Sequence, residues 1–98
     1  MKNLKLYINL LEDFKKLGED TKAIKKECKQ CFKIYKQDFY DMTELACVLH
    51  NLSMAYETDK KSLSNLYNRL FEDVNDYVIL EFKDRDLDYY FDRVGWED

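Results

Sequence analysis

Apolar residues recur along this chain at the three- and four-residue spacing that is typical of helices buried on one face. The first such segment covers about residues 3–17. Its predicted core stripe consists of Leu4, Tyr7, Leu11 and Phe14, with Leu10 and Leu17 beside it. Gly18 follows, and glycine readily takes the left-handed backbone that often ends a helix. The pattern therefore predicts one amphipathic helix that stops at Gly18.

The second and third helices are separated by a capping signal rather than by a loop. Asp20 can cap the second helix, whose predicted inward side chains are Ile24, Cys28, Cys31, Phe32, Tyr35 and Phe39. Asp41 and Glu44 have the spacing of a capping box, which favours a third helix over about residues 42–56 instead of one continuous helix. Glu44 is the only charged residue in that range. A helix that is apolar nearly all round is buried, so the third helix is predicted to be central.

A fourth helix is predicted after a polar loop at residues 57–61, with Asp59 or Ser62 as its cap. Its apolar residues keep a helical period over residues 63–78, and a short fifth helix is predicted over residues 86–94. The connections are short enough for neighbouring helices to run antiparallel. The predicted fold is all-α, an antiparallel four-helix bundle with a short fifth C-terminal helix.

Composition supports one helical domain over residues 1–98. The chain has no proline and two glycines, so it lacks the turn residues of β-rich folds. The longest uncharged run, residues 45–56, is too short to cross a bilayer. Three cysteines without an export signal are typical of a reducing compartment, so we expect a cytoplasmic protein with free thiols.

Charge is segregated along the chain and adds more to the functional interpretation than any motif. Residues 1–36 hold ten basic and five acidic residues, net +5, whereas residues 72–98 hold three and ten, net −7. The lysine stripe, an arc about 100° wide on the second helix, consists of Lys22, Lys25, Lys26, Lys29, Lys33 and Lys36. The predicted partner-binding residues of the acidic end are Glu72, Asp73, Asp76, Asp84, Asp86, Asp88, Tyr89 and Asp92. Like charges four residues apart destabilise a helix by a few tenths of a kcal/mol, so a stripe of one sign favours a docking surface.

One pattern has the spacing of a zinc site. Cys28 and Cys31 are followed, after fifteen intervening residues, by Cys47 and His50, and an antiparallel hairpin would bring the two pairs level. Structural zinc sites usually hold their cysteines on turns, whereas both pairs here fall in mid-helix. Free cysteine is also commonly buried in cores. Four core residues are therefore the preferred interpretation, and neither a metal nor another cofactor is expected.

The same features favour a binding protein over an enzyme, because nothing places an orienting group or an oxyanion hole beside His50, the only histidine. The predicted function is a non-catalytic protein-binding module, a small acidic antagonist that occupies a basic surface of a larger, for example nucleic-acid-handling, protein. Phage and mobile-element proteins of the anti-CRISPR type are similar in size, charge and lack of catalytic residues. Three alternatives stay open: nucleic-acid or anionic-surface binding by the lysine stripe, a bundle of the bacteriocin-immunity type, and the zinc hairpin. No membrane partner is expected, and the chain would be a monomer or a homodimer.

Overall fold

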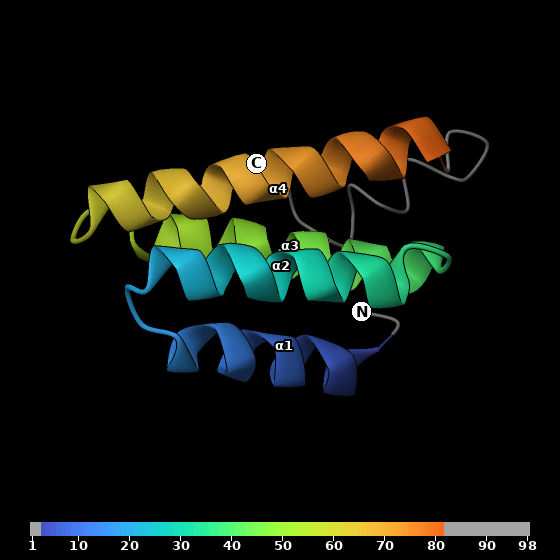
Figure 1. The fold of residues 1–98 in the computed structure, drawn as a ribbon, viewed down its shortest axis with the longest axis horizontal. Coiled ribbons are helices and arrows are strands. Elements are labelled where there is room, and N and C mark those ends of the chain that lie inside the picture. The colour runs from blue at the N-terminus through green and yellow to red at the C-terminus, as the bar shows by residue number, and fades with distance from the viewer. Residues whose placement is uncertain (1–2, 82–98) are drawn as a thin grey trace.

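The computed structural model describes residues 3–81, and these form four α-helices without a strand. The helices are α1 (Leu4–Lys16), α2 (Thr21–Tyr35), α3 (Phe39–Ala55) and α4 (Lys61–Glu81). Figure 1 shows that consecutive helices run in opposite directions and that α2 and α3 lie between α1 and α4. The all-helical prediction is confirmed for the described residues. The predicted fifth helix, over residues 86–94, lies outside them.

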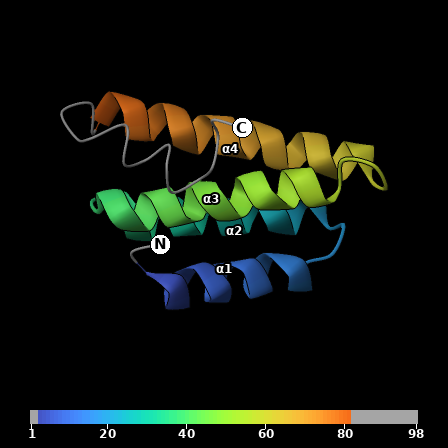
Figure 2. The same cartoon turned by 180° about the vertical axis from the view of Figure 1, so that it is seen from behind.

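α3 occupies the centre of the arrangement and packs against each of the other three helices. Eleven of its 17 residues are buried, among them Leu45, Leu49 and Leu52. The view from behind places α3 between α1 and α4 (Figure 2). The prediction of a central third helix is thus confirmed. Its physical basis is the near absence of charge over residues 42–56, where Glu44 is the only charged residue.

The starts of α1, α2 and α3 are fixed by side-chain caps. The capping residues Asn3, Asp20 and Asp38 each accept a hydrogen bond from the backbone N–H three residues later, at 3.0 to 3.1 Å. After α1, Gly18 has a φ of +59°, a backbone conformation that residues with a Cβ rarely adopt. The predicted roles of Asp20 and Gly18 are confirmed.

The predicted capping box of α3 is wrong. The helix begins at Phe39, because Asp38 rather than Asp41 provides the first cap. Glu44 therefore lies beyond the first turn, where it is buried and only 1% exposed. Its Oε2 accepts a hydrogen bond from the backbone N–H of Asn3 at 2.8 Å. The buried carboxylate of α3 thus stabilises the start of α1, where negative charge offsets the helix dipole.

The buried face of α1 is rotated from its predicted position. Leu10 and Phe14 are buried, whereas Leu4, predicted to belong to the core stripe, is 57% exposed. Leu4 lies about 120° around the helix from Leu10, so a helix that buries Leu10 must turn Leu4 outward. The apolar arc of α1 is wider than its contact with the core, and its sequence alone could not say which part is covered.

α4 begins at Lys61, between the two residues predicted to cap it, Asp59 and Ser62. It continues without interruption to Glu81, so residues 78–81 are helical. Its buried residues keep the predicted period and consist of Leu63, Leu66, Tyr67, Val74 and Val78, together with Ser64. α4 therefore presents one continuous apolar face to α3 and α2.

Candidate binding groove and charged surfaces

α2 has one buried face and one fully charged face. Ile24, Cys28 and Cys31 are buried in the core, while all six residues of the lysine stripe are exposed. Within residues 3–81, none of these lysines forms an ion pair with an acidic side chain. In the described part of the chain, the positive charge of this face is therefore exposed and not neutralised by an ion pair.

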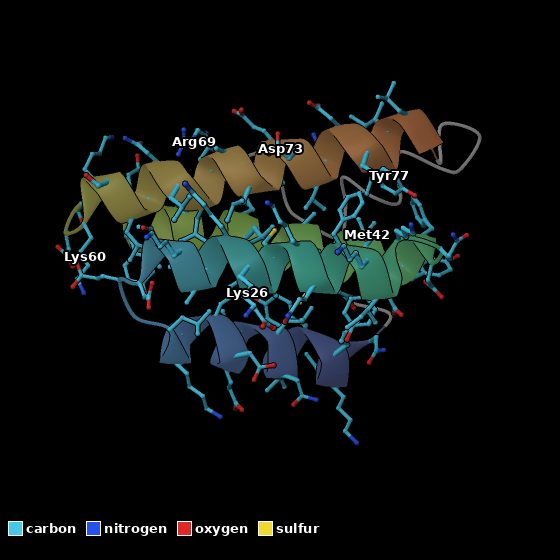
Figure 3. All side chains as sticks on the ribbon, in the orientation of Figure 1. Lys26, Met42, Lys60, Arg69, Asp73 and Tyr77 are labelled. Atoms are coloured by element: carbon cyan, nitrogen blue, oxygen red, sulfur yellow. The ribbon has the colours of Figure 1, made fainter. Side chains whose placement is uncertain are left out.

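An open groove of about 470 Å³ lies between α2 and α4. Its apolar lining is buried or half-buried and forms a floor of Cys28, Phe32, Leu66, Leu70 and Val74. Its charged lining is exposed and forms a rim of Lys25, Lys29, Lys33, Arg69 and Asp73. Figure 3 shows Arg69 and Asp73 along α4, next to α2. Its described lining combines an apolar floor with four cations and one anion.

One end of the groove is closed by an aromatic contact between its two walls. The rings of Phe32 and Tyr77 meet edge to face, with 4.6 Å between their centroids. The hydroxyl of Tyr77 also donates a hydrogen bond to the backbone carbonyl of Lys36 at 3.1 Å. These contacts hold the C-terminal end of α2 against α4, so the groove is open along its length but fixed at this end.

The other contact of α4, with α3, contains a reciprocal pair of buried serines. The Ser53 hydroxyl donates to the backbone carbonyl of Ser64 at 3.0 Å, and the Ser64 hydroxyl donates to the carbonyl of Ser53 at 2.7 Å. Small side chains at this position allow the two helix backbones to approach closely. A smaller hollow of about 260 Å³ lies beside the serines and has a mainly polar lining that includes His50 and Glu57.

The thiols of the Cys28–Cys31 pair are chemically quiet in this environment. Burial, together with the negative charges of Asp73 and Glu27, raises the pKa of Cys28 to about 12. Burial also raises the pKa of Cys31 to about 12, together with Glu27, whose Oε2 accepts a hydrogen bond from the Cys31 thiol at 3.5 Å. Both thiols therefore stay protonated at neutral pH. Because the thiolate is the reactive form and the metal ligand, neither residue is prepared to react or to bind a metal.

The four residues of the zinc-like pattern are not brought together. Among residues 3–81, no three His, Cys, Asp or Glu side chains are grouped so that they could hold a metal ion. Cys28 lines the groove beside α4, whereas Cys47 accepts a weak hydrogen bond from Asn51 at 3.9 Å. His50 packs on Phe71, with ring centroids 5.0 Å apart. The spacing resembles a zinc site, but the side chains point to different neighbours.

Three of the predicted acidic binding residues lie in the described part of the chain. Glu72, Asp73 and Asp76 are all exposed on α4, and none of them forms an ion pair within residues 3–81. Asp73 belongs to the groove rim, among the cations, whereas Glu72 accepts a hydrogen bond from Asn68 at 3.2 Å. The remaining predicted residues lie outside the described ones: Asp84, Asp86, Asp88, Tyr89 and Asp92.

Comparisons of the chain with protein-family models, with curated proteins and with solved structures find no match. No described helix has the length and apolar character that a membrane crossing requires. The function therefore has to be argued from the groove and the charged surfaces alone.

The groove was not predicted from the sequence, although Lys25, Lys29 and Lys33 on its rim belong to the predicted lysine stripe. Arg69 is the only arginine before residue 85, and it is the one basic residue of the predicted fourth helical segment, residues 63–78. Lys25, Lys29 and Lys33 also follow one edge of α2 at four-residue spacing. What the sequence could not provide is that this edge of α2 lies beside Arg69 and the apolar side chains of α4.

Proposed function

We propose that this chain is a non-catalytic protein-binding module, an antiparallel four-helix bundle that acts by occupying a surface of another protein. The supporting observation is charge that is exposed and forms no ion pair within residues 3–81: the six lysines of the lysine stripe, and Glu72, Asp73 and Asp76 on α4. Unpaired like charges destabilise the helix that carries them. A partner of opposite charge accounts for their presence better than solubility does, because mixed signs would serve solubility at less cost.

The first candidate, which the small size and the acidic charge of the chain favour, is that the acidic residues dock on a basic surface of a larger protein. Glu72 and Asp76 are exposed on α4 and do not line the groove, and the sequence after residue 81 adds six acids against three bases. Complementary charge accelerates association and selects the partner. A small acidic antagonist of a nucleic-acid-handling protein, of the anti-CRISPR type, fits this chemistry.

Binding of nucleic acid by the lysine stripe is the second candidate. It is favoured by the exposure of all six lysines on one face of α2. Six lysines could neutralise up to about six phosphates, which would make binding steeply dependent on salt. Against it, the stripe contains no arginine for base recognition and no aromatic residue for stacking.

The two candidates need charges of opposite sign, so matched charge variants separate them. The acid variant carries Glu72→Gln, Asp76→Asn and Asp84→Asn, and the control variant carries Lys22→Gln, Lys26→Gln and Lys36→Gln. Each is immobilised, and the proteins it retains from a lysate are identified by mass spectrometry and then tested in purified form. We expect a purified basic partner to be bound by the wild type and the lysine variant but not by the acid variant.

Nucleic acid binding is measured in parallel with a labelled single strand and a labelled duplex of about 20 nucleotides over a range of salt concentrations. If only the lysine variant loses affinity, and only for these oligonucleotides, the second candidate replaces the first. If neither variant changes any purified interaction, both candidates are wrong, because neither the acidic residues nor the lysines outside the groove then contribute to a partner.

A further inference from the structure

The geometry of the groove between α2 and α4 points to a binding site for an acidic amphipathic helix of a partner protein. This site uses charge of the opposite sign to the acidic surface proposed above, and it does not depend on that surface. Its occupant is defined by three features of the groove: the length of the floor, the spacing of the cations and the balance of charge along the rim.

The floor has the length of a short helical segment. Leu66, Leu70 and Val74 follow α4 at four-residue intervals, so they extend over about 12 Å, or two helical turns. Cys28 and Phe32 line the groove from α2, one turn apart. An amphipathic helix that lies in a groove inserts apolar side chains at the same one-turn spacing. The volume of about 470 Å³ lies in the range of sites that accept several such groups.

The rim has the charge spacing that carboxylates on such a helix would match. Lys25, Lys29 and Lys33 stand at intervals of one turn along α2, and Arg69 lies on the wall formed by α4. Glutamates that flank the apolar stripe of an incoming helix at four-residue spacing can meet this row in register. Asp73 is the one acidic residue of the described rim, so the rim carries four positive charges against one negative charge.

Two other anionic ligands fit the groove less well. A fatty acid has a single carboxylate, which would contact only one end of a row of cations that is about 12 Å long. The remaining cations would have no partner in the ligand. A nucleic acid has no apolar stripe for the floor, and it gains much of its contact energy from base stacking on aromatic rings. Phe32 is the one aromatic residue in the described lining, and its ring already packs against Tyr77.

The test uses a synthetic helical peptide and two matched lysine variants of the full chain. The fluorescein-labelled peptide has about 14 residues, with leucines on one face and flanking glutamates, and its binding is followed by fluorescence anisotropy. The groove variant carries Lys25→Gln, Lys29→Gln and Lys33→Gln, and the control variant carries Lys22→Gln, Lys26→Gln and Lys36→Gln. Both remove three exposed lysines from α2, but the control residues do not line the groove.

We expect the groove variant to bind the peptide about tenfold more weakly, because exposed ion pairs contribute modestly and three of them are lost. The control variant should change the affinity less than about threefold, through general electrostatics alone. Asp73→Asn should tighten binding severalfold, because it removes the one described rim charge that repels the peptide. A peptide with serine in place of leucine should lose most of its affinity, because it leaves the floor unfilled.

Three results would overturn the inference. Equal loss in the two lysine variants would show attraction to the whole of α2 rather than binding in the groove. Equal binding of the serine and leucine peptides would show that the floor is not used. Tighter, groove-dependent binding of oleate or of a single-stranded oligonucleotide would assign the groove to that ligand instead. Circular dichroism of each variant verifies the fold, and the acid variant of the previous section should bind the peptide normally.

Discussion

α4 packs against α3 on one side and against α2 on the other, and the two contacts are built differently. Against α3, the buried serines Ser53 and Ser64 exchange hydrogen bonds with each other's backbone, and the apolar side chains of Leu49 and Leu52 on α3 are at most 1% exposed. Against α2, an apolar floor remains open beneath a rim of exposed charges. We infer that the α3–α4 contact supplies stability, which leaves the α2–α4 contact free to serve recognition.

The largest expected difference between the two contacts is in the cost of removing a leucine. Leu49 of α3 is 0% exposed, so Leu49→Ala should lower the free energy of unfolding by about 2–5 kcal/mol through lost burial and a cavity. Leu70→Ala, in the half-buried floor of the groove, should cost less than half as much, because water already reaches that site. Urea denaturation followed by circular dichroism measures both values. Equal losses would mean that the groove is part of the stabilising core.

The next largest expected difference is between two serines of α4, one buried and one exposed, when each is replaced by the larger leucine. Ser64→Leu places a larger side chain where α3 and α4 approach closely and breaks the hydrogen bond to Ser53, so it should cost about 1–3 kcal/mol. Ser62→Leu makes the same chemical change on the exposed side of the first turn of α4, where we expect a change within about 0.5 kcal/mol. If the two substitutions proved equally mild in urea denaturation, the serine contact would not be tightly packed.

The local parts of this fold could be read from the sequence because they depend on neighbours in the chain. Asp20 and Gly18 mark a start and a stop through their own backbone geometry. The central position of α3 follows from the lack of charge over residues 42–56, where Glu44 is the only charged residue. The start of α3 was predicted at Asp41 and is wrong, because Asp38, three residues earlier, caps the helix.

The candidate site could be predicted only in part, because it depends on which helices become neighbours. The exposure of the lysine stripe follows from helical periodicity, since the apolar face of α2 can point only to the core. The groove needs the relative placement of α2 and α4, and no pattern within either helix specifies that Lys29 and Arg69 will line one hollow. For the same reason, Leu4 is exposed although its spacing fits the predicted core stripe.

The smallest expected effect is a loss of stability at high pH that arises from the buried Cys28 thiol. It tests whether water is excluded from the floor of the groove. The pKa of this thiol is raised from 9.0 to about 12 in the folded state, mainly by burial. The resulting stability is fully present below pH 9, where the thiol is protonated in both states. It is lost as the pH rises from 9 toward 12, because the unfolded chain releases the proton first. At about pH 10 the loss should be about 1.4 kcal/mol relative to neutral pH.

Comparison of the wild type with Cys28→Ala isolates this loss, since Cys31 and Tyr67, whose pKa values are also raised by burial, remain in both proteins. The variant will be less stable at neutral pH because it lacks the sulfur atom, so the informative quantity is the change between neutral pH and about pH 10 in urea denaturation. The wild type should lose more stability than the variant over this interval. If the two lose the same amount, water reaches the thiol freely. The floor would then be an open surface, and the burial that an apolar partner side chain needs for its binding energy would be missing.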